Sequence, residues 1–335
     1  MKAAIKSATL GMMALGMVSG AAMAQSSVTV YGVADAGLVL ERGGAAGNVS
    51  KVTSGIASGS RLGFKGTEDL GDGLAANFVL ENGLGIDTGA AGQGGLLFGR
   101  QAWAGLSGRF GAVALGRQYS PWYKTVRDVA DPFCDGLAGA ITSVFAANTR
   151  VDNMVSYASP KLAGWSAELA YGAGEVAGDA SANRTLGGSA TYSEGPLTVV
   201  LVHHQRENPT ATAHSRNTLL TARYMFANGF TGHVAHAVNR DLLGNESKDD
   251  LLGGTVRMGA SKFIASVIYH QDDSAANHDA RQYAVGYLYS LSKRTDLYTA
   301  YGHVNNRNGA SFKIGNATDS GSGVTGVNLG MRHVF

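Results

Sequence analysis

Residues 98–118 read FGRQAWAGLSGRFGAVALGRQ, residues 120–149 read SPWYKTVRDVADPFCDGLAGAITSVFAANT, and residues 150–157 read RVDNMVSY. The first segment predicts two strands of roughly ten residues joined by a tight turn at Gly108–Gly111, and the last predicts another strand. The long segment between them far exceeds a usual connection, so it is either functional or disordered. Its many apolar side chains favour an ordered loop packed against a large scaffold. These apolar residues are Trp122, Tyr123, Val126, Val129, Phe133, Leu137, Ile141, Val144 and Phe145.

The N-terminus carries the features of a secretory signal peptide. Two lysines precede an apolar run at residues 8–18, and the small-x-small pattern AMA at residues 22–24 is typical of a cleavage site. We therefore predict a signal peptide over residues 1–24 and a mature chain over residues 25–335. The alternative, an uncleaved membrane anchor, is disfavoured because the apolar run is too short to span a bilayer. The chain is thus expected to be exported across the inner membrane.

Composition narrows the class of protein. Removing the signal peptide takes away two lysines and no acids, so Lys+Arg falls from 27 to 25 against 25 Asp+Glu, and the mature chain has no net charge. No basic excess or run of like charges points to a nucleic-acid partner. Beyond the signal peptide, no stretch of about 20 apolar residues predicts a transmembrane helix. Glycine is abundant at 48 of 335 residues, and the single cysteine, Cys134, cannot form an internal disulfide.

Apolar and polar residues alternate along the mature chain, which predicts strands with one apolar face. Short connectors such as residues 193–196 take turns with longer ones such as residues 41–55 and 305–323. Counting the runs gives sixteen strands, or about 19 residues per strand and connector over 335 − 24 = 311 mature residues. The apolar faces include Val28, Val30, Ala34, Ala36, Leu38 and Leu40; Leu62 and Phe64; Leu74, Ala76, Phe78 and Leu80; Phe263, Ala265, Val267 and Tyr269; and Tyr283, Val285, Tyr287 and Tyr289.

These features together describe an all-β fold, a 16-stranded antiparallel transmembrane β-barrel. Within lipid, only a closed barrel satisfies every N–H and C=O group at the strand edges. At sixteen strands the interior is too wide for side chains to fill, so we expect it to hold water. The last strand supports this interpretation, because its alternation carries an aromatic residue to the chain end. Its apolar face is Val327, Leu329, Met331, His333 and Phe335.

The mature chain also carries longer motifs, namely SVTVYGVADAG at residues 27–37, GSRLGFKGTEDLGDGL at 59–74, the block at 98–123, DPF at 131–133, SKRTDLY at 292–298 and GMRHVF at 330–335. Together they resemble the Gram-negative trimeric porins, in particular the β-proteobacterial branch. The resemblance covers almost all of the mature chain. It implies a homotrimer in which the third external loop, about residues 120–149, folds inward and narrows the channel.

The resemblance further implies that arginines on the wall face acids on the loop and wall across this constriction. By motif position the arginines are Arg61, Arg100 and Arg150. The acidic candidates are Glu81 at the end of the third strand and, on the loop, Asp128, Asp131 and Asp135. The chain departs from the family pattern at Cys134 and Asp135, where glycines are common, so the local turn and the number of acids differ.

Each site prediction has a plainer alternative. The arginines could contact lipid headgroups at the rim, although a charge facing lipid near the midplane costs several kcal/mol. The three loop aspartates, spaced by three and four residues, could form one solvated face of a short helix. The pairs His203–His204 and His233–His236 each have members of opposite parity, so we predict no metal site. No GxSxG motif occurs, and GQGG at Gly92 lacks a strand–helix context, so we predict no catalytic residue and no cofactor.

The sequence therefore predicts a porin in the outer membrane of a Gram-negative bacterium, a passive channel for small hydrophilic solutes and ions that performs no enzymatic reaction. Its expected partners are two further copies of the chain, outer-membrane lipid and lipopolysaccharide, and no nucleic acid. Anion preference is expected to be mild, because Glu81 and the loop aspartates oppose the arginines. The alternatives are a substrate-selective channel with aromatic tracks and, less favoured, an outer-membrane enzyme or an adhesin.

Overall fold

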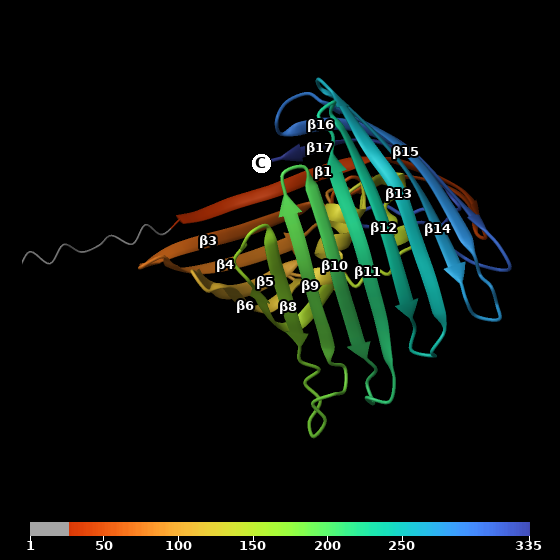
Figure 1. The fold of residues 1–335 in the computed structure, drawn as a ribbon. Coiled ribbons are helices and arrows are strands. Elements are labelled where there is room, and N and C mark those ends of the chain that lie inside the picture. The colour runs from red at the N-terminus through yellow and green to blue at the C-terminus, as the bar shows by residue number, and fades with distance from the viewer. Residues whose placement is uncertain (1–26) are drawn as a thin grey trace, which may run out of the picture.

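Strands make up most of residues 27–335, the part of the chain that the computed structural model describes (Figure 1). The predicted signal peptide at residues 1–24 lies outside the described residues. Neighbouring strands pair antiparallel, and β1 pairs with β17, so the sheet closes on itself. The strands are β1 (Ser27–Gly44), β2 (Gly47–Ser54), β3 (Arg61–Gly71), β4 (Leu74–Gly83), β5 (Gln101–Gly108), β6 (Gly111–Tyr119), β7 (Arg150–Ala158), β8 (Trp165–Gly172), β9 (Thr185–Glu194), β10 (Leu197–Glu207), β11 (His214–Met225), β12 (Phe230–Arg240), β13 (Glu246–Met258), β14 (Ser261–Asp272), β15 (Ala280–Ser290), β16 (Thr295–Asn306) and β17 (Thr325–Val334).

The strands β2 and β3 together form one barrel strand that is interrupted at residues 55–60. Both lie beside β1, with Ser54 opposite Ala36 and Arg61 opposite Val33. Counting β2 and β3 as one gives sixteen strands, which confirms the predicted strand number. The sequence interpretation was wrong about residues 41–55, which were expected to be a long connector. They form the β1–β2 hairpin, because its turn needs only the residues between Gly44 and Gly47.

Alternation along the strands separates an outer apolar face from an inner face, as predicted. Leu201 is 51 % exposed and Leu220 is 53 % exposed, whereas the intervening Val200, Val202 and Leu219 are at most 2 % exposed. Apolar side chains left exposed in this way form the surface that a transmembrane barrel presents to lipid. The predicted faces hold in other strands, where the exposed members include Val28, Val30, Leu38, Leu40, Leu62, Phe64, Phe263, Tyr269, Tyr283, Val285, Tyr289, Leu329 and Met331.

The C-terminus takes part in closing the barrel. The backbone N–H of Gly32 donates to the carbonyl of Phe335 at 3.0 Å, and the N–H of Phe335 donates to the carbonyl of Gly32 at 3.1 Å. These two bonds continue the β1–β17 ladder to the last residue of the chain. The Phe335 ring also covers Gly32, where an added Cβ would lie 2.3 Å from the ring.

The segment expected to be an ordered loop, residues 120–149, contains four short helical turns. The Ser120 hydroxyl caps the first, accepting from the N–H of Tyr123 at 3.0 Å, and Pro121 occupies the first helical position. No helix among residues 27–335 is both long and apolar enough to cross a membrane. The helical segments of this loop are α1 (Pro121–Thr125), η2 (Val126–Ala130), η3 (Leu137–Gly139) and η4 (Ile141–Ser143); η1 (Gln93–Gly95) lies between β4 and β5.

The loop packs against side chains that point to the barrel interior. Trp122, Val126 and Ile141 are fully buried, and they share one apolar cluster with wall residues of β10–β14 such as Val202 and Leu219. A second cluster joins Leu137 and Ala138 to inward residues of β14–β16. Each fully buried apolar side chain contributes about 1.5–3 kcal/mol, so together they hold the loop firmly against the wall. Figure 1 shows this yellow segment within the ring of strands.

Candidate functional site

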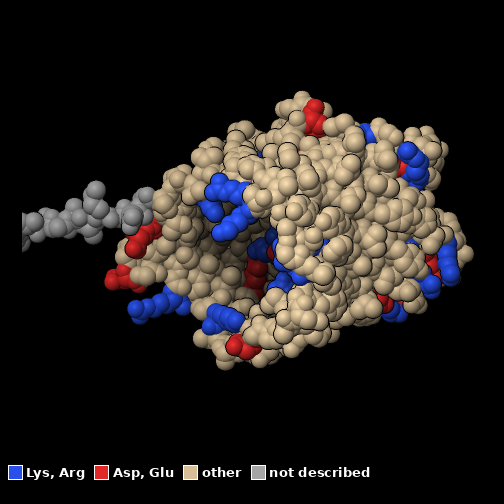
Figure 2. Space-filling model, turned by 90° about the horizontal axis from the view of Figure 1, so that it is seen from above, with Lys and Arg blue, Asp and Glu red and all other residues tan. Residues whose placement is uncertain are grey.

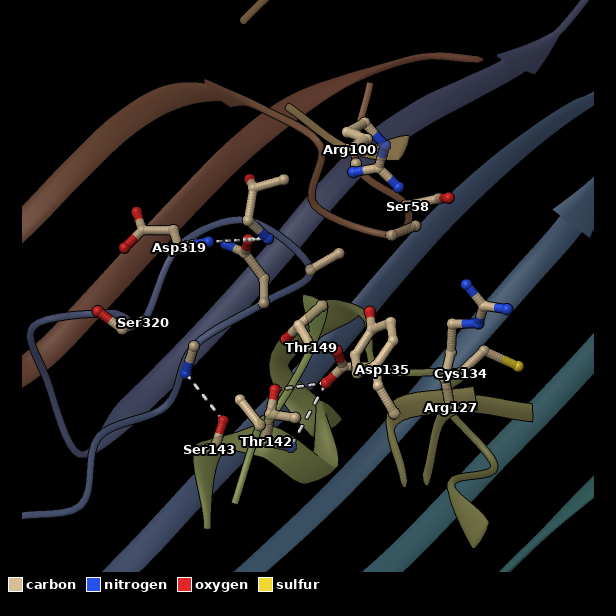
Figure 3. Close-up of a pocket in the computed structure, with 18 of the residues that line it drawn as sticks. Ser58, Arg100, Arg127, Cys134, Asp135, Thr142, Ser143, Thr149, Asp319 and Ser320 are labelled. Carbon is tan, nitrogen blue, oxygen red and sulfur yellow. Dashed lines mark hydrogen bonds between the residues drawn. The ribbon is translucent and has the colours of Figure 1, made fainter. Parts of the chain in front are cut away.

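A cavity of about 970 Å³ lies between the wall, the 120–149 loop and the connection from β16 to β17. Figure 2 looks into one end of the barrel, where basic and acidic side chains gather in the hollow and most of the visible outside is uncharged. Figure 3 shows where the lining comes from, with Arg100 and Ser58 on the wall, Asp135 on the loop and Asp319 on the β16–β17 connection. The basic residues that line it are Arg61, Arg100, Arg127, Arg150, Lys313 and Arg332, and the acidic ones are Asp135 and Asp319.

The three predicted wall arginines all line this cavity. Arg61 begins β3, Arg150 begins β7, and Arg100 directly precedes β5. Arg150 Nε donates to the backbone carbonyl of Arg100 at 2.9 Å, and Arg61 Nη2 donates to Ser58 Oγ at 2.6 Å. The structure therefore brings these three guanidinium groups to one part of the lumen, as the motif positions implied. The alternative placement, in contact with lipid headgroups, does not fit these lumen contacts.

Glu81 is held close to the arginines but does not line the cavity. Its side chain accepts from Arg100 Nε at 2.8 Å through Oε1 and from the Tyr31 hydroxyl at 2.9 Å through Oε2. The residue is only 3 % exposed. The negative charge of Glu81 therefore lies within the wall, where it cancels part of the charge of Arg100.

The loop aspartates do not act as a set, because only Asp135 lines the cavity. The Asp128 side chain is 52 % exposed and forms a two-pronged ion pair with Arg127, at 2.7 and 2.8 Å. Asp135 is buried and accepts from the Thr142 hydroxyl at 2.5 Å. Burial raises the pKa of the Asp135 carboxyl above its usual range.

Asp131 is a structural residue of the loop. It is 1 % exposed, so the expectation that it faces the lumen was wrong, and so was the alternative of a solvated helix face shared by all three aspartates. Its carboxylate accepts from the backbone N–H of Phe133 at 2.9 Å, of Asp135 at 2.8 Å and of Ile141 at 3.0 Å. Burial, assisted by the charge of Asp135, raises the pKa of Asp131 to about 7, although these hydrogen bonds oppose the shift.

The family model described as Gram-negative porin matches residues 8–309. The chain belongs to the Gram-negative porin family. Outer membrane porin protein 32 of Delftia acidovorans is 33 % identical, over 95 % of this chain and 96 % of the relative.

Two solved structures extend the comparison. The anion-selective porin from Comamonas acidovorans superposes with a TM-score of 0.81 and 29 % identity, over 93 % of this chain and all of that one. A trimer form of OmpT from Vibrio cholerae has a TM-score of 0.69 and 17 % identity, over 92 % of this chain and 99 % of that one, and shows the shared fold alone. The protein is thus an outer-membrane porin, and its barrel lies in the outer membrane.

The interrupted strand of this porin fixes the loop from the opposite wall. The carboxylate of Asp35 is fully buried and accepts from the backbone N–H groups of Ile56 at 3.0 Å and Ser58 at 2.9 Å, which turns residues 55–60 inward. The carbonyl of Ile56 then accepts from the N–H of Leu137 on the loop at 2.7 Å. The inward turn thus lines the cavity and holds the loop at the same time.

Several residues that line the cavity of the porin were missed from sequence. Lys313 and Asp319 come from the connection at residues 305–323, which looked like an ordinary external loop. Lys51 of β2 forms an ion pair with Asp319 at 2.5 Å. Although burial opposes it, the hydrogen bond from Lys51 lowers the pKa of Asp319. Arg127 was missed as well, although it lies beside the predicted Asp128 in the long segment.

Proposed function

We propose that this porin lets small hydrophilic solutes and ions diffuse passively through its lumen, with a preference for small anions and without any chemical reaction. The observation that supports this is the charge of the cavity, where six basic side chains and two acidic ones form the lining. Asp319 pairs with Lys51, which it shares with Glu41, and Asp135 is buried. The solved Comamonas porin, similar over nearly the whole chain, is itself described as anion-selective.

The proposed constriction consists of Arg61, Arg100 and Arg150 on the wall and Arg127 and Asp135 on the loop. At physiological salt the Debye length is about 8 Å, so charges lining a narrow passage act on ions throughout its width. A cluster of like charges raises the local concentration of counter-ions, and here those are anions. Glu81 cancels part of the charge of Arg100, so the positive excess comes mainly from the other basic residues of the lining.

We further propose that the porin assembles as a homotrimer surrounded by outer-membrane lipid and lipopolysaccharide. A trimer form is described for the structurally similar OmpT of Vibrio cholerae. The exposed apolar side chains of the outer face, such as Leu201 and Leu252, suit contact with lipid or with another subunit. The mass of the detergent-solubilised complex tests the assembly, and the mass of a single chain would contradict it.

The test of the function is the reversal potential of the refolded porin in planar bilayers under a KCl gradient. Wild-type protein should give a reversal potential on the anion side. Arg61→Gln and Arg150→Gln should each move it towards cation preference, because each removes one positive charge. Arg100→Gln should move it most, because it also leaves the carboxylate of Glu81 without its arginine partner.

A matched control is Arg281→Gln, since this arginine lies on the outer face with its guanidinium 4.8 Å from the centre of the Tyr269 ring. Its removal should leave the reversal potential unchanged. If the wild-type channel proves cation-preferring, or if all three lumen variants keep the wild-type value, the proposed role of these arginines is wrong.

A further inference from the structure

Tyr119, the last residue of β6, lies at the centre of the arginine cluster. It directly precedes the 120–149 loop and is 5 % exposed. Its hydroxyl oxygen accepts from Arg100 Nη2 at 2.7 Å and from Arg150 Nη2 at 3.1 Å. A phenol oxygen has two lone pairs, so both of its acceptor positions are taken by guanidinium groups.

The ring of Tyr119 makes further contacts with cations. The guanidinium carbon of Arg150 lies 4.8 Å from the ring centre, and that of Arg127 lies 5.1 Å away. The ring also stacks on Tyr123, with 5.2 Å between the ring centres and 27° between the planes. Arg127 extends over this second ring as well, at 5.5 Å. Two stacked tyrosines therefore form one aromatic surface that Arg127 and Arg150 share, while Arg100 contacts Tyr119 through its hydroxyl.

Three guanidinium groups in one narrow passage repel one another and would otherwise separate into the surrounding water. An aromatic face attracts a cation within about 6 Å, and a hydroxyl oxygen accepts its N–H groups. Both contacts hold a cation without adding a negative charge. A carboxylate at the same place would also hold the arginines, but it would cancel part of their charge, as Glu81 does for Arg100.

We propose that Tyr119 is a positioning residue that sets the anion preference of the channel by holding Arg100, Arg127 and Arg150 together without adding a negative charge to those that Glu81 and Asp128 already bring to Arg100 and Arg127. This proposal rests on the anion-preferring function proposed above. It assigns the selectivity of the constriction to a neutral side chain as well as to the charged ones. Removing a single hydrogen bond or cation–π contact changes the population of a side-chain position by about two- to tenfold.

The experiment compares Tyr119→Phe, which removes the hydroxyl and keeps the ring, with Tyr119→Leu, which removes both. The ratio of chloride to potassium permeability should fall by about twofold in the first and further in the second, because more arginine contacts are lost. Current noise in the open channel should rise in the same order, because guanidinium groups that lose these contacts become mobile. Tyr171→Phe on the outer face is the control for loss of a hydroxyl, and it should leave both readings unchanged.

Arg150→Gln is measured beside these variants so that two failures can be told apart. If Arg150→Gln shifts the permeability ratio and both Tyr119 variants keep the wild-type ratio and noise, Tyr119 has only a structural role and the proposal is overturned. If Arg150→Gln also leaves the ratio unchanged, the proposed function fails with it. Should Tyr119→Leu fold poorly, Tyr119→Phe still decides the matter, because it keeps the ring that packs on Tyr123.

Discussion

Replacing Asp131 with asparagine should loosen the 120–149 loop without opening the barrel. The carboxylate accepts three backbone N–H groups, one through Oδ1 from Phe133 and two through Oδ2 from Asp135 and Ile141. Asparagine has one oxygen, so in its better orientation it keeps the two bonds at Oδ2 and turns its NH₂ group towards the N–H of Phe133. One buried donor then loses its partner, which costs about 1–3 kcal/mol.

The same range of free energy corresponds to an increase of about 5- to 150-fold in the population of displaced loop. The strands should be unaffected, because Asp131 bonds only to the backbone of its own loop. Two measurements follow the loop directly. Single-channel current should become noisier, and Cys134, which lines the cavity and is exposed, should react with a charged thiol reagent at a different rate.

The matched control for Asp131→Asn is Asp128→Asn in the same loop. The Asp128 side chain is half exposed and pairs with Arg127 alone, so its replacement should leave the loop backbone in place. If Asp131→Asn shows wild-type noise and wild-type thiol reactivity at Cys134, the three hydrogen bonds do not hold the loop. That result would also remove the reason for assigning Asp131 a structural role.

Two further predictions concern loop contact and barrel closure. Gly302→Ala should displace the loop and alter the conductance, because the new Cβ would lie 1.9 Å from the carbonyl oxygen of Ala138. Gly232→Ala is the control and should keep the wild-type conductance, because its nearest atom is 3.5 Å away. Equal conductance of the two variants would contradict the contact between Gly302 and the loop. Deleting Phe335 should lower the yield of assembled outer-membrane protein, because two closing hydrogen bonds with Gly32 are lost, whereas an unchanged yield on semi-native gels would show that closure does not need them.

Much of the barrel could be predicted from sequence because strand faces follow from local alternation. A residue such as Leu201 is assigned outward by its neighbours in the chain alone, and the same holds for the terminal strand. The wall arginines Arg61, Arg100 and Arg150 were predicted in a different way, by motif position from the resemblance to porins.

The rest of the site depends on contacts between segments far apart in the chain. Asp131 looked like a lumen acid, but its burial results from loop backbone that returns to it at Ile141. Tyr119 looked like an ordinary strand-end aromatic, and only the fold brings Arg100 and Arg150 to its hydroxyl. The interruption at residues 55–60 was hidden because it needs the buried Asp35, twenty residues earlier, to hold its backbone.

That interruption also constrains how the length of the chain can change. Ser54 pairs with Ala36, and Arg61 pairs with Val33. The chain advances seven residues from Ser54 to Arg61, whereas β1 covers the same distance with three residues, from Ala36 to Val33. The interruption therefore holds four extra residues. Four is even, so the side chains of β2 and β3 keep the same inward and outward alternation across the break. Loss or gain of a single residue there would reverse one half of the strand and turn apolar side chains into the water. Changes in steps of two would leave the wall intact and alter only how far this turn projects into the lumen, so evolution can change the width of the channel here without rebuilding the barrel.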